Sequence, residues 1–363
     1  MLLSRRGRDG KREKRSFLKP VNLNDAKTFK MISEGDTEGV YFLEGRGIKE
    51  LLVRAKPRNF GELVNCIALY KPSTIGAGLW KRYVGEVEVR GDWHDKNNAV
   101  DKVLKRTKGI LLFDNQIEEM LVNVAGLPEN EASEIAAELK TKGAGTPSIR
   151  LKFINCAMDK GVSEEEAEKV FDFIEKHMGF VQNEADTSIQ AYMSYRTAYL
   201  KANHFLEYFV ALLNSYTGIS ERQTNYISYL ESRGVKLLGI DINKSGYEFV
   251  IEEEAIRYPI SFLHGVDRNS LLLILEERKK GGDFSSLEDF MDRVGVEVKA
   301  GVIETLIDSG AFDWTGSDRG RMKDYCRRYL RRLEEKERVD KGEVLKEHKK
   351  KPRTEQLSLF EEE

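Results

Sequence analysis

The sequence predicts a mainly α-helical protein with two folded domains between charged ends. Apolar residues recur at three- and four-residue steps over most of the chain, cap residues and glycines bracket these stretches, and the alternating patterns of strands are few. The 363 residues are 40% hydrophobic, which is enough for two or three domains with their own cores.

The first folded domain is expected over residues 20–216. It opens with a short capped helix in NLNDAKTFKMISEG, which begins at an Asn/Asp signal and ends at Gly35. A turn or strand and two helices that meet at Pro57 follow in GVYFLEGRGIKELLVRAKPRNFGELVNCIALY. The polar, glycine-broken stretch GEVEVRGDWHDKNN predicts a loop or a small hairpin.

Four more helical patterns complete this domain. KGILLFDNQIEEMLVNVAGL predicts a short apolar strand or helix start and then an amphipathic helix, and PENEASEIAAELKTKG is bounded by Pro128 and Gly143. Ser163 and Glu166 form a capping box at the start of SEEEAEKVFDFIEKHMGF. The longest pattern is SIQAYMSYRTAYLKANHFLEYFVALLNSY, whose aromatic stripe is expected to be core rather than a base-stacking platform.

The second folded domain is expected over residues 217–315. A helix, a short strand and a small hairpin are predicted in ERQTNYISYLESRGVKLLGIDINKSGYEFVIEEEAIRYPI, followed by small helices joined by glycine-containing turns. Residues 316–355 predict a charged helix that continues into a flexible linker.

The net charge of −2 conceals a strong segregation of charge. Residues 1–19, predicted to be a disordered basic arm, carry eight Lys/Arg against two acids, and residues 319–355 carry fifteen against eight. Residues 20–318 are therefore acidic, with a net charge of −12. Basic ends suit a polyanion such as DNA, because each neutralised phosphate releases counterions, although ends that serve only solubility are an alternative.

Several classes of protein find no support in the sequence. No run of 18 apolar residues or secretory signal occurs, so we expect a cytoplasmic, nucleoid-associated protein rather than a membrane protein. The three cysteines predict small buried residues in a reducing compartment. The acids of GIDIN and GDWHD are interpreted as solvated rather than metal ligands, and no phosphate loop of the GxxxxGK type occurs. We therefore expect no cofactor, no metal and no catalytic residue.

The sharpest motif of the second domain is FLHGVDRNSLLLIL, which resembles half of a helix-hairpin-helix. Such a turn exposes backbone N–H groups at a helix N-terminus, where they contact a DNA phosphate without reading bases. Asp267 stands where a second glycine is usual. Its carboxylate repels a phosphate but can cap the following helix, so a purely structural hairpin is the alternative. The candidate phosphate contacts are His264, Gly265, Val266, Arg268, Lys279 and Lys280.

Several stretches resemble the C-family bacterial replicative polymerase, the alpha subunit of DNA polymerase III, in the same order along the chain. The likeness covers roughly Pro20 to Asp313 and implies a fingers-like helical domain followed by a helix-hairpin-helix domain. The stretches are GDTEGVYFLEGRGIKELL, IALYKPSTIGAGL, KGILLFDNQIEEM, YRTAYLKANHFLEYFVALL, GVKLLGIDINKSGYEF and FSSLEDFMDRV with VIETLIDSGAFD.

The departures from the family pattern predict a lost nucleotide site. The family's palm, with its catalytic carboxylates, lies upstream of the matched region, so we expect no metal site in this chain. Two arginines that the resemblance places in the fingers are Ala136 and Ala137 here, and a lysine and a histidine after Asn183 are Glu184 and Asp186. Lys71 keeps the charge of an expected arginine without its bidentate fork.

A short apolar cluster near the end of the chain resembles the pentapeptide with which proteins dock on the bacterial beta sliding clamp. A glutamine and apolar anchors on a flexible tether suit an extended peptide that fills pockets, and the alternative is a patch that folds back on the second domain. The residues are Gln356, Leu357, Ser358, Leu359 and Phe360.

Three functions follow as hypotheses. The first is a non-catalytic DNA replication or repair accessory protein that binds the sliding clamp and DNA without sequence specificity, with other polymerase subunits as further partners. The second is a split DNA polymerase subunit that supplies fingers to a separately encoded palm. The third is a structural interaction module that binds a protein through its acidic face.

Overall fold

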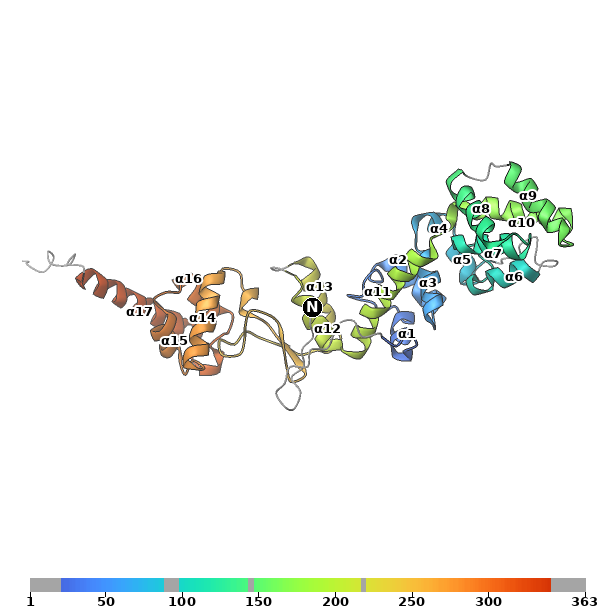
Figure 1. The fold of residues 1–363 in the computed structure, drawn as a ribbon. Coiled ribbons are helices and arrows are strands. Elements are labelled where there is room, and N and C mark those ends of the chain that lie inside the picture. Colours follow the sequence, from blue (N-terminus) through green and yellow to red (C-terminus); the bar gives the residue numbers. More distant parts are fainter. Residues whose placement is uncertain (1–20, 88–97, 143–146, 217–219, 341–363) are drawn as a thin grey trace, which may run out of the picture. The chain divides into compact units, whose positions relative to one another are not determined.

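The computed structural model describes residues 21–87, 98–142, 147–216 and 220–340. Chain contacts divide the protein into two units, Met1–Leu212 and Leu213–Glu363 (Figure 1). The described residues are mostly helical and contain one small sheet, so the predicted mainly α fold is confirmed. The polar segment predicted as a loop or hairpin lies largely, and the end of the charged linker entirely, outside the described residues.

The first unit contains two groups of helices, each with its own core. In the first group, the long helix α11 packs against α1 and α3 and contributes the buried Tyr195, whose hydroxyl donates to Asn22 O at 2.7 Å. The helices of this group are α1 (Ala26–Ser33), α2 (Arg46–Ala55), α3 (Phe60–Leu69), α4 (Pro72–Gly76), α5 (Leu79–Tyr83) and α11 (Glu184–Asn203).

The helix starts and ends of this group follow from local side chains. Asp25 caps α1 by accepting a hydrogen bond from Thr28 N at 2.9 Å, and Gly35 leaves the helix with a φ of 71°. Asn59 caps α3 by accepting from Glu62 N at 3.0 Å. The short first helix and the pair that meets near Pro57 are therefore confirmed.

The second group of helices in this unit surrounds a separate core (Figure 1). Here α7 packs against α6 and α8, and α9 packs against α10, with the rings of Phe153 and Phe171 5.4 Å apart. Ser163 caps α10 by accepting from Glu166 N at 3.3 Å, which is one of the two hydrogen bonds of the predicted capping box. The elements are α6 (Asn98–Leu104), η1 (Lys105–Thr107), α7 (Asp114–Asn123), α8 (Glu129–Lys142), α9 (Pro147–Asp159), α10 (Glu164–His177) and η2 (Met178–Phe180).

The longest predicted helix is two helices in the structure. After α11 the chain bends at His204, which has a φ of −141° and a ψ of 58°, and α12 (Phe205–Leu213) begins. Tyr195, Tyr208 and Phe209 are buried, so the aromatic stripe is core, as predicted. The Tyr208 hydroxyl donates to Gly39 O at 2.6 Å and so fixes the start of α12 in the first unit.

The second unit begins with α13 (Glu221–Ser232), which has a capping box between Ser220 and Gln223. Three short strands follow in the order β1-β3-β2, with β1 parallel and β2 antiparallel to the central β3. In this register Leu237 pairs with Ile256 and Val250 pairs with Arg257. The strands are β1 (Leu237–Leu238), β2 (Val250–Glu252) and β3 (Ala255–Arg257).

The core of the second unit lies among its last four helices. Phe290 is fully buried there, with its ring 5.1 Å from that of Phe284 and 5.0 Å from that of Phe312. The elements are η3 (Ile260–Phe262), α14 (Arg268–Gly281), α15 (Leu287–Val294), α16 (Ala300–Asp308), η4 (Asp313–Thr315) and α17 (Arg319–Asp340).

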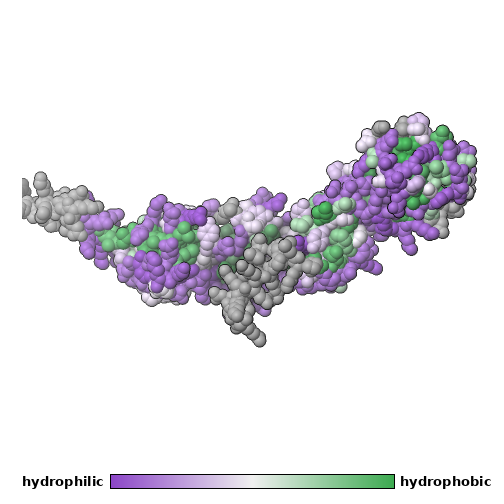
Figure 2. All heavy atoms as spheres, viewed as in Figure 1, coloured by the Kyte–Doolittle hydropathy of each residue, from purple (hydrophilic) through white to green (hydrophobic). Residues whose placement is uncertain are grey.

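The three cysteines are free thiols, and two of them are small buried residues as predicted. Burial raises the pKa of Cys66 to about 12 and that of Cys326 to about 11, whereas Cys156 is only partly buried. The face of the protein shown in Figure 2 is mostly hydrophilic, with apolar residues in local groups. In the described ranges, every helix is too short or too polar to cross a membrane.

Candidate functional site

The residues predicted to form a lost nucleotide site lie on three elements of the first unit. Lys71 precedes α4, and its Nζ donates to Gln190 Oε1 on α11 at 2.7 Å and lies 5.3 Å from the centre of the Phe42 ring. The structure therefore brings Lys71 against α11. This cation is held by a neutral amide and an aromatic face.

The two alanines on α8 have different surroundings. Ala136 is 6% exposed and belongs to the core of the second helix group, whereas Ala137 is exposed. Ala137 lies one turn before Lys140, whose Nζ donates to Asp114 Oδ2 at 3.0 Å. Of the two positions, only Ala137 presents its side chain to solvent.

Asn183, Glu184 and Asp186 form the N-terminus of α11. Asn183 is the N-cap and accepts a hydrogen bond from Asp186 N at 2.9 Å. Glu184 accepts from Arg106 Nη1 and from Asn115 Nδ2, each at 2.5 Å. Asp186 is exposed in the first turn, where the helix dipole favours an acid.

Asp114, the first residue of α7, occupies the space in front of α11. A parallel bridge between Phe113 and Gln182 places these two helix starts together, with Asp114 N donating to Gln182 O at 3.0 Å. The Asp114 carboxylate accepts from Asn183 Nδ2 at 3.1 Å and from Glu184 N at 3.4 Å. A carboxylate of the protein itself thus lies at the helix N-terminus, the part of a helix that is suited to bind an anion.

The charges around this helix start are mostly internal ion pairs. Arg106 bridges Glu184 and Glu119, with Nη2 donating to Glu119 Oε1 at 2.9 Å. Acids outnumber cations in the cluster, which comprises Asp114, Glu119, Glu184, Asp186, Arg106 and Lys140. The arrangement favours a closed structural network over a receptor for a triphosphate.

The predicted hairpin in the second unit is a tight turn between η3 and α14. Gly265 has a φ of 89°, a backbone conformation that favours glycine. His264, Gly265 and Arg268 are exposed. In the described part of the chain, the N–H groups of Gly265 and Arg268 donate to no protein acceptor, so they remain available to an anion.

Asp267 caps α14 rather than leaving its N-terminus open. Its Oδ1 accepts from the N–H groups of Asn269 and Ser270 at 3.0 Å each. Hydrogen bonds from Ser270, and less strongly the nearby Lys299 charge, lower the pKa of the Asp267 carboxyl. The carboxylate therefore uses two of the donors that a phosphate could contact at this hairpin.

Lys279 and Lys280 lie at the other end of α14 from the turn. Eleven residues separate Lys279 from Arg268, which corresponds to about 17 Å along the helix axis. Lys280 Nζ donates to Glu277 Oε1 at 2.8 Å. The structure therefore brings His264 to Arg268 together and separates the two lysines from them.

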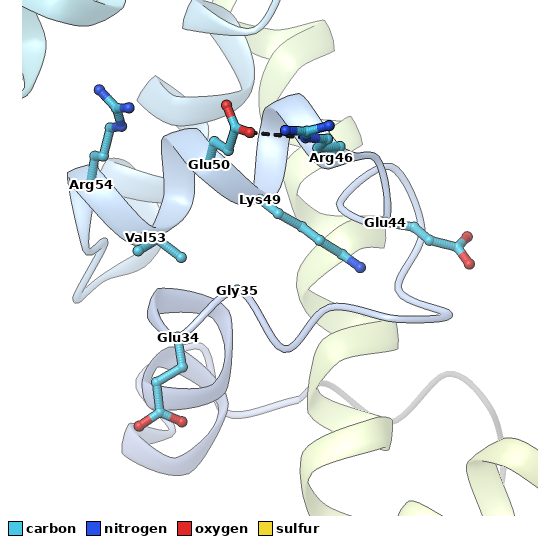
Figure 3. Close-up of a pocket in the computed structure, with 8 residues that line it drawn as sticks. All are labelled: Glu34, Gly35, Glu44, Arg46, Lys49, Glu50, Val53 and Arg54. Carbon is cyan, nitrogen blue, oxygen red and sulfur yellow. Dashed lines mark hydrogen bonds and ion pairs between the residues drawn. The ribbon is translucent and has the colours of Figure 1, made fainter. Parts of the chain in front are cut away.

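A hollow of about 520 Å³ lies between the end of α1 and one side of α2 (Figure 3). Its walls carry three glutamates and three cations, among them Arg46 and Glu50, whose side chains are 3.2 Å apart. Lys49 pairs with Glu38 just beyond the hollow. None of the predicted site residues lines it, and its balanced charges indicate no particular ligand.

The remaining candidates are the clamp-binding residues and the acids of GDWHD and GIDIN. The clamp-binding residues Gln356 to Phe360 and the acids of GDWHD lie outside the described residues. Asp241, the acid of GIDIN, accepts from Asn243 N at 2.8 Å in a turn.

Sequence reasoning missed Arg106, Asp114 and Lys140. They come from three separate segments, and the pairing of Phe113 with Gln182 brings one of them, the segment of Asp114, to the start of α11. One feature of the sequence does point to them. Glu184 and Asp186 stand where the resemblance implies a lysine and a histidine, and acids that replace cations within a fold need cations nearby. Lys299 was also missed, because it lies some 30 residues from the hairpin in sequence.

Two segments of the chain match known protein families. Residues 7–161 match the bacterial DNA polymerase III alpha subunit finger domain, and residues 234–322 match the helix-hairpin-helix motif. These two segments belong to those families, and the chain is a relative of the DNA polymerase III alpha subunit. The predicted resemblance is confirmed.

The curated relatives are alpha subunits of DNA polymerase III. The DNA polymerase III subunit alpha of Aquifex aeolicus is 33% identical over 300 residues, which are 82% of this chain and 26% of the relative. That of Deinococcus radiodurans is 33% identical over 82% of this chain and 23% of its own length, and that of Escherichia coli K12 is 29% identical over 88% and 28%. The chain spans about a quarter of the length of these relatives.

Proposed function

We propose that this chain is a DNA replication or repair accessory protein that binds DNA and docks on the beta sliding clamp, and that its fingers no longer bind nucleotide. The observation that carries the loss of nucleotide binding is the Asp114 carboxylate at the N-terminus of α11, together with Glu184 and Asp186. Acids at this position repel a triphosphate and already use the donors that would contact it.

Titration with a deoxynucleoside triphosphate and Mg²⁺ tests the loss of nucleotide binding. We expect no saturable binding up to millimolar nucleotide for the wild type. Magnesium alone and the exposed-surface variant Glu134→Gln serve as controls for charge effects. Saturable micromolar binding that disappears in Lys71→Ala contradicts the proposal.

The hairpin at Gly265 supports the DNA-binding part of the proposal. Its unused backbone donors lie beside Arg268, and Lys299 adds positive charge near the same turn. Such contacts hold a phosphate without reading sequence. Two duplexes of unrelated sequence are therefore expected to bind with similar affinity, and Arg268→Gln with Lys299→Gln weakens both equally.

The clamp-binding part rests on residues Gln356 to Phe360. We expect micromolar binding to the clamp, and a loss of at least about tenfold in Leu359→Ala with Phe360→Ala, because a few apolar anchors carry most of the affinity of a peptide. The matched control is Glu361→Ala with Glu362→Ala in the same tail. Equal affinity of the wild type and the Leu359/Phe360 variant refutes clamp docking through this motif.

Lys71 favours a second function, a fingers subunit that works with a separately encoded palm. Its ammonium has no acidic partner in the described ranges, and Gln190 and Phe42 hold it beside α11. Primer extension with a palm-bearing partner tests this function. Activity that requires this chain, and that falls in Lys71→Ala, supports the split polymerase and excludes the non-catalytic role.

A further inference from the structure

We propose that one face of α17 is a second contact surface for duplex DNA phosphates, separate from the hairpin at Gly265. The surface, here termed the arginine face, consists of Arg321, Arg328 and Arg332. The inference rests on the proposed DNA binding and adds a named surface to it.

The opposite side of α17 holds the helix to the second unit. Met322 and Cys326 are buried in the core. Beside them Arg319, Lys323 and Arg327 pair with acids of neighbouring segments: Arg319 with Asp313 at 2.5 Å, Lys323 with Asp308 at 2.5 Å and Arg327 with Glu304 at 3.0 Å. These three cations are neutralised by the fold.

The arginine face has no such neutralisation. Arg321, Arg328 and Arg332 are exposed, and in the described part of the chain none of them forms an ion pair. Arg328 donates only to the backbone oxygen of Asp324, at 3.2 Å. Spacings of seven and four residues place the three side chains in one row, about 10 Å and 6 Å apart along the helix axis.

This row of like charges is unfavourable for the isolated helix. Arg328 and Arg332 are four residues apart, and the exposed Arg331 adds another cation beside the row, so their charges repel. The row ends at the exposed Glu335. A phosphate backbone relieves this repulsion, and the planar guanidinium forks of arginine suit phosphate oxygens.

An anionic membrane fits this surface less well than DNA. Helices that lie on a membrane insert an apolar face beside their cations. The apolar residues of α17 from Met322 to Leu330 instead pack against the core of the second unit. The arginine face therefore offers charge alone, which is how proteins contact the DNA backbone.

Binding of full-length protein to a duplex of about 20 base pairs, measured by fluorescence anisotropy between 50 and 200 mM salt, tests the inference. The variant combines Arg321→Gln, Arg328→Gln and Arg332→Gln. The matched control removes three exposed lysines of the first unit, as Lys27→Gln, Lys56→Gln and Lys102→Gln. Circular dichroism checks that both variants keep the wild-type helix content and Tm, since none of the six side chains is buried.

We expect the arginine variant to bind about tenfold or more weakly at 100 mM salt, and the slope of log K against log salt to become shallower by about two to three. The control should retain most of the wild-type affinity. Unchanged affinity and slope in the arginine variant overturn the inference, as does a loss of the same size in the control. Capture by anionic vesicles that needs these arginines, without an effect on DNA, also overturns it.

The same experiment separates this inference from the proposed function. If the arginine variant binds normally while Arg268→Gln with Lys299→Gln binds weakly, the arginine face has no role and DNA binding by the hairpin stands. If the wild type binds no duplex at 50 mM salt, the DNA-binding part of the proposed function and this inference both fail.

Discussion

Single residues of the first unit show how this fold tolerates charge in its interior. Lys201 on α11 is 1% exposed, and its Nζ donates to Asp36 O at 2.9 Å and to Asp36 Oδ1 at 3.1 Å. The ring of Phe209 lies 5.7 Å away. Burial lowers the pKa of Lys201 to about 8, although the Asp36 charge opposes the shift. The ion pair offsets only part of the desolvation.

Lys201 gives a prediction about pH and stability. The folded protein releases this proton near pH 8 and the unfolded chain near pH 10.4, so between these values the unfolded state holds more protons and the free energy of unfolding rises with pH. Relative to Lys201→Met, the wild type should gain at most about 3 kcal/mol between pH 7 and pH 10. Urea unfolding of both proteins across this range, with Lys102→Met as the exposed control, measures it. A constant difference between the two proteins contradicts the assignment.

Glu184 gives a second prediction at this scale. Because its carboxylate accepts from Arg106 and Asn115, Glu184→Gln should lower the free energy of unfolding by about 1 kcal/mol. A double-mutant cycle with Arg106→Gln should give a coupling of about 0.5 to 1 kcal/mol. The control is Glu134→Gln, an exposed glutamate of α8. A coupling of zero means that the acids at the start of α11 do not support the fold.

At the scale of elements, sequence patterns predict the helices better than their partners. Asp25 and Ser163 cap helices where the sequence indicates, because a cap depends on side chains a few residues away. The bend at His204 escaped prediction, because apolar residues keep three- and four-residue steps across it. Tertiary contacts such as the hydrogen bond from Tyr208 to Gly39 O define the bend instead.

The candidate sites show the same difference between features set by neighbouring residues and features set by tertiary contacts. The turn at Gly265 depends on neighbouring residues alone. The sequence therefore predicts both a tight turn at this glycine and that Asp267 can cap the helix that follows. The burial of Ala136 and the ion pairs of Glu184 depend on segments far apart in the chain. No local pattern contains that information, and a resemblance to a family supplies only the positions to inspect.

The hairpin itself yields a prediction about charge. Asp267→Asn keeps an amide oxygen that can cap α14 and removes a negative charge beside the candidate phosphate contacts. DNA affinity should therefore rise about fivefold at 100 mM salt, with an unchanged Tm. Asp159→Asn, which removes an exposed acid from the first unit, is the control. Unchanged affinity in Asp267→Asn indicates that DNA does not approach this turn.

For the whole molecule, the main feature is that the cores of the two units are separate. The last helices of the second unit enclose Phe284, Phe290 and Phe312, and the first unit has two separate clusters. Tryptophans fall in both units, with Trp80 on α5 and Trp314 in η4. Each unit can therefore be followed by fluorescence after the tryptophans of the other are replaced by phenylalanine.

Separate cores predict separate unfolding. Phe290→Ala removes a fully buried ring and should destabilise the second unit by about 3 to 5 kcal/mol, because the cavity collapses only partly. This substitution should shift the unfolding transition that Trp314 reports to a lower urea concentration. In a Trp314→Phe background the remaining tryptophans report the first unit, and there Phe290→Ala should leave the transition in place. The reciprocal variant, Tyr195→Ala, should shift only the first-unit transition. If either substitution moves both transitions equally, the two units unfold as one cooperative structure, and the proposed arginine face and the candidate nucleotide site then belong to one energetic unit.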